Sequence, residues 1–141
     1  MLFFQRQRTR DSCRFDAVNN YLQANVLHGA VAKTYFQSYK KKHPFAVFTL
    51  THNHDQENFL TFLLEQLTGK RHRIVDADVR ATLLATKNVP SFLVYSSTHC
   101  WCVLRTVDNE YYELDGLKVN TIHIPYSRVE HLFTTYHCII S

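Results

Sequence analysis

The amino-acid sequence predicts an α+β protein in which helices come first and an antiparallel sheet follows. Apolar residues recur at helical spacing as far as residue 67, and beyond residue 71 they gather in short runs typical of strands. Helices and strands that are segregated in this way build α+β folds. The chain has 141 residues, of which 45% are hydrophobic. This is enough for one packed core, so residues 1–141 are expected to form a single domain.

Three helices are expected in the first half of the chain. Their ranges are residues 12 or 13 to 23, 30 to 41 and 55 to 67. Asp11 or Ser12 can cap the first helix, because short polar side chains accept hydrogen bonds from the first helical N–H groups. A His-Pro pair at residues 43–44 ends the second helix, and Gly69 ends the third.

The second half of the chain predicts the sheet and two further helices. Strands are expected at residues 72–75, 91–96, 100–107, 110–114, 119–124 and 136–140. Helices are expected at residues 76–87, with Asp76 as the cap, and at residues 127–133, over one or two turns. The third and fourth of these strands are joined across Asp108-Asn109, which predicts a hairpin.

Charge and composition argue against several classes of partner. The net charge of +4 is modest, and no nucleic-acid-binding motif accompanies the basic clusters at residues 6–10, 40–42 and 70–73. No apolar run approaches the roughly 18 residues that span a membrane, and "MLFF" lacks the apolar core of a signal peptide. We therefore expect no nucleic-acid or membrane partner. The four cysteines are expected to be free thiols in a reducing compartment, the cytoplasm, the nucleus or both.

Cys13 stands at the start of the first expected helix. Unpaired N–H groups and the helix dipole at such a position favour a thiolate, which is a far better nucleophile than a thiol. The same N–H groups can stabilise the oxyanion that forms in acyl transfer. A cysteine at a helix start is also compatible with a buried, inert thiol, so the interpretation depends on a nearby base.

His99 and Asp115 are the candidates for that base and for the group that orients it. His99 opens a strand-like run directly after a polar corner, "SST", whereas the other eight histidines have no obvious partner. If the hairpin turn is centred near residues 107–109, antiparallel pairing places His99 opposite residues 115–118. A carboxylate at Asp115 can then accept a hydrogen bond from one imidazole nitrogen and hold the other toward Cys13. An aspartate before Gly116 is equally common in turns.

Three segments resemble the Josephin-domain cysteine proteases of the papain-like superfamily. The segments are "CRFDAVNNYLQ", "SFLVYSSTHCWCVLR" and "YYELDGL", in the order in which the family has them. The residues that match the family pattern are Cys13, Ala17, Val18, Asn19, Asn20, Leu22, Gln23, Ser91, Phe92, His99, Trp101, Arg105 and Asp115. The resemblance implies a papain-like fold, with the nucleophile at a helix N-terminus packed on an antiparallel sheet.

The resemblance also implies a function and a division of roles. The chain is expected to be a deubiquitinase that hydrolyses isopeptide or peptide bonds after the C-terminal tail of ubiquitin or a ubiquitin-like protein, without a cofactor. Cys13 is the nucleophile, His99 the base and Asp115 the orienting group. Gln7, six residues before the cysteine, is the expected oxyanion-hole side chain, and Gln5 is the less favoured alternative.

The sequence departs from the family pattern in three places. Trp101 stands two residues after His99, and it either forms a wall of the substrate site or fills the core. Asp115 lies one place further along than the pattern has it, which predicts an extra residue or a bulge in the hairpin. The region between the first helix and the central strands, which in the family supplies a helical arm that helps to grip ubiquitin, is shorter.

Other functions are compatible with parts of the sequence. A catalytically silent module that binds ubiquitin or another partner, and a cysteine protease that acts on another protein, are the main alternatives. Cys100-x-Cys102 and His52-x-His54 could contribute to a metal site, but one-residue gaps are not the usual spacing of structural zinc ligands, so no metal is expected.

Overall fold

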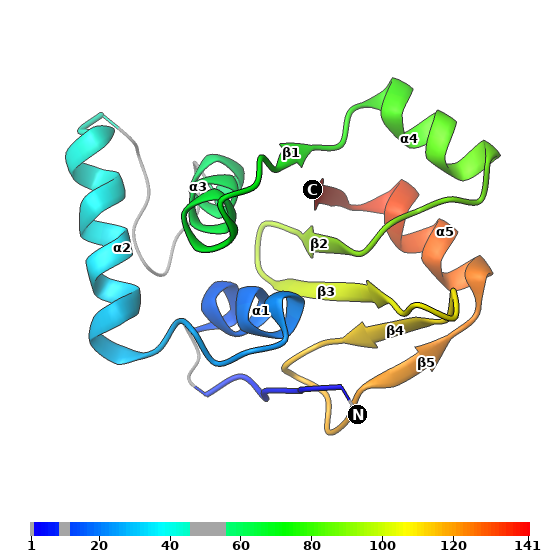
Figure 1. Cartoon of the computed structure of the whole chain (residues 1–141), viewed down its shortest axis with the longest axis horizontal. Coiled ribbons are helices and arrows are strands. Elements are labelled where there is room, and N and C mark those ends of the chain that lie inside the picture. Colours follow the sequence, from blue (N-terminus) through cyan, green and yellow to red (C-terminus); the bar gives the residue numbers. More distant parts are fainter. Residues whose placement is uncertain (1, 9–11, 46–55) are drawn as a thin grey trace.

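The structure is a computed structural model of the chain, and the residues it describes are 2–8, 12–45 and 56–141, without the side chains of residues 56 and 57. Within this part of the chain there are five helices and one six-stranded antiparallel sheet, which confirms the α+β class (Figure 1). The helices are α1 (Cys13–Leu22), α2 (Gly29–Lys42), α3 (Gln56–Thr68), α4 (Ala77–Ala85) and α5 (Tyr126–Thr135). The strands are β1 (Arg73–Ile74), β2 (Phe92–Tyr95), β3 (Cys100–Arg105), β4 (Tyr111–Leu114), β5 (Ile122–Ile124) and β6 (His137–Ile140).

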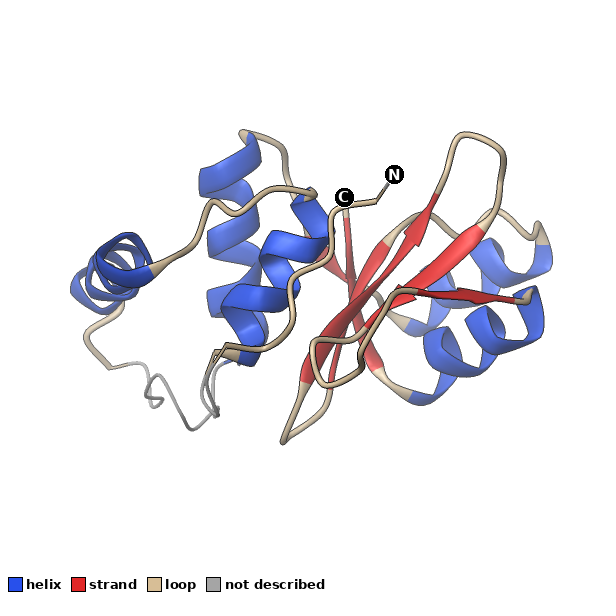
Figure 2. Ribbon diagram, turned by 90° about the horizontal axis from the view of Figure 1, so that it is seen from below, coloured by secondary structure: helices blue, strands red, loops and turns tan. Residues whose placement is uncertain are grey.

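The sheet lies between two groups of helices. Its strand order is β1-β6-β2-β3-β4-β5, and every neighbouring pair is antiparallel. Figure 2 shows α1, α2 and α3 on one side of the sheet and α4 and α5 on the other. Strands buried on both faces alternate their side chains between two cores. In β2, for example, Leu93 and Tyr95 join the core under α1 and α3, whereas Phe92 and Val94 join the core under α4 and α5.

The hairpin between β3 and β4 forms where the sequence predicts it. The two strands pair in one register from Cys102–Leu114 to Arg105–Tyr111, without a bulge. The Thr106 N–H then donates to the Glu110 carbonyl at 2.8 Å, which closes a turn over residues 107–109. Asn109 takes the left-handed conformation, with φ 61°, that three-residue turns of this kind require. The hairpin therefore has a three-residue turn and no bulge.

Several boundaries differ from the prediction. β3 ends at Arg105 rather than at residue 107 because the chain already turns at Thr106, and β5 begins only at Ile122. α5 has 10 residues instead of one or two turns. It is extended because apolar residues at spacings of three and four are all buried against the sheet, namely Val129, Leu132 and Phe133.

The helix ends confirm some of the predicted caps and correct others. The Asp76 side chain accepts a hydrogen bond from the Val79 N–H at 2.8 Å, and Gly69 ends α3 with φ 68°. Ser12 occupies the cap position of α1, but it makes no capping hydrogen bond because its hydroxyl donates to Asp16 instead. Asp11 and Asp55, the expected first residue of α3, lie outside the described residues.

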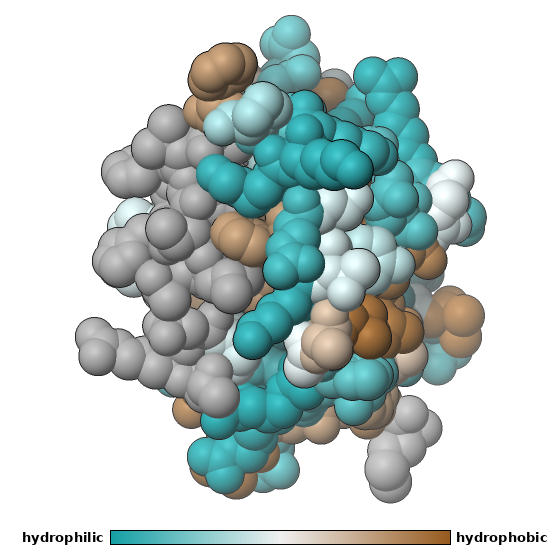
Figure 3. Space-filling view, turned by 90° about the vertical axis from the view of Figure 1, so that its left-hand side faces the viewer, coloured by the Kyte–Doolittle hydropathy of each residue, from teal (hydrophilic) through white to brown (hydrophobic). Residues whose placement is uncertain are grey.

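The region between α1 and the central strands contains α2 and α3. Only Ala32 and Tyr39 of α2 are buried, and its last turn carries three lysines at residues 40–42. The side of the molecule on which α2 lies is accordingly mostly hydrophilic (Figure 3). In the described ranges, no helix combines the length and the apolar character needed to cross a membrane.

Candidate active site

Cys13 is the first residue of α1, which packs against β3. Phe15, Ala17 and Val18 anchor the helix in the core, while the Cys13 side chain stays half-buried at the helix end. The Ser12 side chain makes no capping hydrogen bond at this end of α1. The backbone N–H groups and the positive end of the helix dipole therefore lie close to the sulfur, where they favour a thiolate.

The other three cysteines differ from Cys13 in burial. Cys100, Cys102 and Cys138 are buried, and none of the four cysteines forms a disulfide. Burial is the main cause that raises the pKa of all three buried thiols, and it raises that of Cys138 to about 12. These thiols are protonated at neutral pH and are poor nucleophiles. Cys13 is the cysteine with access to solvent and to a base.

His99 lies at the start of β3, held there by a tight turn. The Ser96 N–H donates to the His99 carbonyl at 2.8 Å, and the His99 N–H donates to the Ser96 hydroxyl at 3.2 Å. Because β3 and β4 are antiparallel, the start of β3 and the end of β4 lie at the same end of the sheet. Asp115 follows β4 directly, and its Oδ1 accepts a hydrogen bond from His99 Nε2 at 2.7 Å. The predicted pair is therefore in contact.

Asp115 is itself fixed by the turn that follows it. Its Oδ1 also accepts from the Leu117 N–H at 3.0 Å, and its carbonyl accepts from the Lys118 N–H at 2.9 Å. Burial acts to raise the pKa of this carboxyl. The hydrogen bonds from His99 and Leu117 and the positive charges of His99 and Lys118 outweigh burial and lower the pKa below its usual value. Asp115 is a carboxylate at neutral pH.

The His99 ring bridges Asp115 and Cys13. Burial, the largest single influence, lowers the pKa of His99. Hydrogen bonds to Asp115 and to Cys13, together with the negative charges of both groups, more than compensate and raise the pKa to about 9. Since Nε2 is bonded to Asp115, Nδ1 is the ring nitrogen that remains to face the sulfur. The three residues predicted from the sequence thus form one connected group.

Trp101 supports His99 from the sheet. The indole is 7% exposed and stacks on the imidazole, with ring centroids 5.3 Å apart and an interplanar angle of 17°. Its N–H donates to Glu113 Oε2 at 3.0 Å, and Arg128 of α5 donates to both oxygens of Glu113 at 3.1 and 3.2 Å. Trp101 therefore packs in the core, and its expected role as a wall of the substrate site stays a prediction. The hydrogen bonds from Arg128 and Trp101 to Glu113 hold the indole ring in the plane on which the His99 ring stacks.

The N-terminal segment, residues 3–8, runs beside this group. The Gln7 N–H donates to the Gly116 carbonyl at 2.9 Å, directly after Asp115. A Cβ at Gly116 would lie 2.8 Å from the backbone nitrogen of Gln7, so only glycine permits this approach. The Gln5 side chain is already engaged, because it donates to Asp16 and accepts from Asn19 at 3.3 Å. Its position favours Gln7 over Gln5 as the oxyanion-hole side chain.

Amide side chains of α1 hold the N-terminal segment in place. Asn20 accepts from the Gln5 N–H at 2.7 Å and donates to the Gln5 carbonyl at 3.0 Å. Gln23 makes the same pair of bonds with Phe3, at 2.8 and 2.9 Å. Asn19, besides its bond to the Gln5 side chain, binds the chain after α1, at Val26 and Leu27. The three amide residues of the segment "CRFDAVNNYLQ" therefore hold the backbone around the site in place.

Besides Glu113, sequence reasoning missed a second carboxylate at this site, Asp16. It is 1% exposed and accepts hydrogen bonds from the Gln5 and Ser12 side chains and from both the backbone and the side chain of Arg8. The available signal was an acidic residue among the buried positions of the first helix, with arginines shortly before it. Asp16 connects the N-terminal segment to the first turn of α1, where Cys13 lies.

The described residues contain no group of three or more His, Cys, Asp or Glu side chains placed to hold a metal ion. Cys100 and Cys102 both point into the core under α1, and His52 and His54 lie outside the part of the chain that the structure describes. Comparison of the chain with protein-family models and with curated proteins finds no match.

Proposed function

We propose that the chain is a cysteine hydrolase, and more specifically a thiol-dependent deubiquitinase that cleaves isopeptide or peptide bonds after the tail of ubiquitin or a ubiquitin-like protein. The observation that supports hydrolysis is the connected group of side chains at the start of α1 and the end of the sheet. His99 is bonded to Asp115 at 2.7 Å, and Cys13 is near enough to the His99 ring to contribute to its raised pKa. A nucleophile, a base and an orienting carboxylate in contact are the parts that acyl transfer requires.

The proposed reaction has two steps. The Cys13 thiolate attacks the carbonyl carbon of the scissile bond, and the resulting oxyanion accepts hydrogen bonds from the Cys13 backbone N–H and the Gln7 side chain. The His99 imidazolium gives its proton to the leaving amine, which departs and leaves a thioester on Cys13. His99, now neutral, takes one proton from water as the water oxygen attacks the thioester. The C–S bond breaks, which regenerates the Cys13 thiolate, and the carboxylic acid product leaves and loses its remaining proton to solvent. Asp115 holds the ring throughout.

The ubiquitin part of the proposal depends on the resemblance to Josephin domains. Residues of the resembling segments surround the group: Asn20 and Gln23 hold the N-terminal segment, and Trp101 stacks on His99. Two helices, α2 and α3, lie in the part of the chain where the family has its ubiquitin-gripping arm. These features support a ubiquitin-like substrate without assigning one.

The test is a hydrolysis assay with a ubiquitin C-terminal fluorogenic amide, run beside a short peptide amide with the same last residues. We expect turnover of the ubiquitin substrate by the wild-type chain in reductant, and a loss of at least about a hundredfold in His99→Ala. His123→Ala is the matched control, because His123 also pairs with a carboxylate, Glu110, at 2.6 Å, but far from Cys13. The control should retain wild-type activity.

The two levels of the proposal fail separately in this assay. If the chain cleaves the peptide amide as well as it cleaves the ubiquitin substrate, the proposal of a cysteine hydrolase is supported and the proposal of a deubiquitinase is wrong. No turnover of either substrate, with tight binding of ubiquitin, would establish the catalytically silent alternative. Equal activity of His99→Ala and wild type would remove the proposed mechanism.

A further inference from the structure

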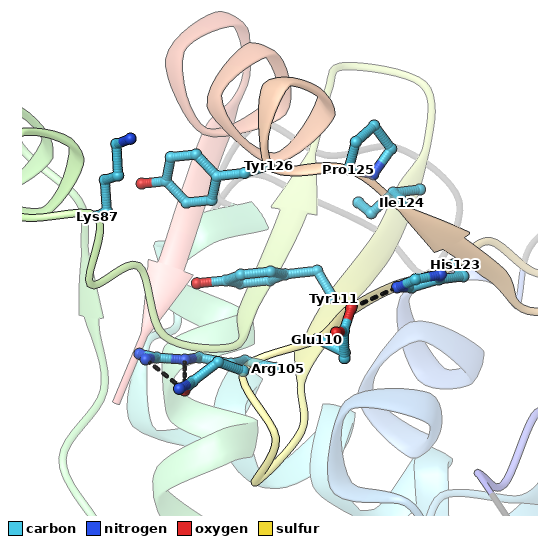
Figure 4. Close-up of a pocket in the computed structure, with 9 residues that line it drawn as sticks. Lys87, Arg105, Glu110, Tyr111, His123, Ile124, Pro125 and Tyr126 are labelled. Carbon is cyan, nitrogen blue, oxygen red and sulfur yellow. Dashed lines mark hydrogen bonds and ion pairs between the residues drawn. The ribbon is translucent and has the colours of Figure 1, made fainter.

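The protein is also hollowed at the opposite end of the sheet from His99 and Asp115. A cavity of about 370 Å³ opens where β3 ends at Arg105, β4 begins at Tyr111 and α5 begins at Tyr126 (Figure 4). Arg105 matches the arginine that ends the central strand in the resembling segment, and the proposed hydrolysis gives it no role.

Two cations line this cavity without a carboxylate partner of their own. Arg105 donates three hydrogen bonds to amide oxygens, two to Asn109 at 3.1 and 2.7 Å and one to Asn88 at 2.7 Å. Neutral amide oxygens orient the guanidinium but leave its charge uncompensated. Lys87 lines the same cavity, and neither cation forms a salt bridge with any described residue. The lining carboxylate, Glu110, is paired with His123 at 2.6 Å.

The Tyr126 hydroxyl is a buried donor that lacks an acceptor among the described residues. The neighbouring Tyr111, whose ring centroid lies 5.9 Å away, shows the usual situation, since its hydroxyl donates to the Val89 carbonyl at 2.6 Å. Burial, followed by Tyr111 and Glu130, raises the pKa of Tyr126, so the hydroxyl stays protonated and able to donate. Figure 4 shows this hydroxyl on the same side of the cavity as the Lys87 ammonium group.

The first turn of α5 adds a third source of positive potential. The cap position is Pro125, and no side chain in the described part of the protein caps this helix. Pro125 and Tyr126 both line the cavity, so the positive end of the helix dipole lies at its wall. Both cations and the helix end attract an oxyanion in this cavity, and the Tyr126 hydroxyl is a donor available to it.

We propose that this cavity binds the phosphate group of a small phosphate ester, with Lys87 and Arg105 supplying the charge and the Tyr126 hydroxyl donating a hydrogen bond. A phosphate has enough acceptor oxygens to meet donors that approach from several directions. The two tyrosine rings and Ile124 provide an apolar wall for the organic part of the ester.

The experiment measures binding of inorganic phosphate and of phenyl phosphate to the full chain by calorimetry at constant ionic strength. We expect both to bind, with phenyl phosphate the tighter because it also contacts the rings. Arg105→Gln and Lys87→Gln should each weaken binding roughly tenfold or more. The control is Lys33→Gln, which removes an exposed cation on α2 and should bind as the wild type does.

Tyr126→Phe separates a ligand site from a structural role. It removes the hydroxyl and keeps the ring, so its thermal midpoint should equal or exceed that of the wild type while phosphate binding weakens. If neither probe binds at millimolar concentration, or if Lys33→Gln weakens binding as much as Arg105→Gln does, the site does not exist. Reaction of Cys13 with an electrophilic label should be the same in all of these variants. The experiment therefore tests the phosphate site independently of the proposed hydrolase activity.

Discussion

Replacing Asp115 by asparagine is expected to lower the pKa of His99 by about one pH unit or more. The substitution keeps the size of the side chain and an oxygen that can accept from His99 Nε2, but it removes the negative charge. In the wild type the charge and hydrogen bond of Asp115 are among the causes that raise the pKa of His99 from 6.5 to about 9. As the pH rises, the imidazolium of Asp115→Asn should therefore lose its proton at a lower pH than the imidazolium of the wild type does.

The magnitude follows from the structure. A pKa of about 9 lies about 2.5 pH units above the ordinary value, which corresponds to about 3 kcal/mol in favour of the protonated ring. Cys13 provides part of this, and the His99 and Asp115 side chains keep 16% and 13% of their surface exposed to screening water. We assign roughly 1–2 kcal/mol to the charge of Asp115, which is about one pH unit or slightly more.

Tryptophan fluorescence can follow this titration directly. Trp101 is the only tryptophan of the chain, and it stacks on His99 at 5.3 Å. A protonated imidazole quenches indole emission, so emission should rise as the pH passes about 9 in the wild type and at a lower pH in Asp115→Asn. His99→Gln should show no such transition, and Asp78→Asn, an exposed carboxylate on α4, should match the wild type. Equal midpoints in wild type and Asp115→Asn would refute the reasoning.

The same pKa predicts how stability depends on pH. The folded chain binds the His99 proton more tightly than the unfolded chain does, because the folded pKa is the higher one. The stabilisation is therefore complete below about pH 6.5 and is lost as the pH rises through about 9. Denaturant unfolding of wild type and His99→Gln should differ most at pH 6 and least at pH 10.

Three further substitutions test the surroundings of the site. Glu113→Gln weakens the hold on Trp101, so kcat should fall severalfold with little change in KM, and the fluorescence transition should broaden. Gly116→Ala introduces a Cβ 2.8 Å from the backbone of Gln7, which should lower stability by about 1–3 kcal/mol in urea unfolding and reduce Cys13 labelling. Asp16→Ala leaves buried donors unsatisfied and should cost about 3 kcal/mol; unchanged stability would show that these hydrogen bonds are dispensable.

The fold class and the approximate position of each helix and strand could be predicted because the apolar periods differ so clearly between the two halves of the chain. The ends of elements were less predictable. α5 is longer than expected because burial of Val129, Leu132 and Phe133 outweighs the poor helix formers around them. Ser12 does not cap α1 because Asp16, four residues later, attracts its hydroxyl.

At the site, Cys13, His99 and Asp115 could be identified because each has a local signature: a helix start, a strand start and a strand end. Asp16 and Glu113 have no such signature. From the sequence alone, a carboxylate within a helix or strand is expected to face solvent unless its partners are known. The partner of Asp16 is Arg8, and the partner of Glu113 is Arg128. Contacts between distant segments decide that these two carboxylates face inward.

The most direct measurement is covalent capture by ubiquitin bearing an electrophile at its C-terminus, followed by peptide mapping of the adduct. If the chain works as proposed, one ubiquitin attaches, the modified peptide contains Cys13, and Cys13→Ala remains folded but unlabelled. An adduct on Cys100, Cys102 or Cys138, or no adduct from a folded and reduced chain, would contradict the central claim.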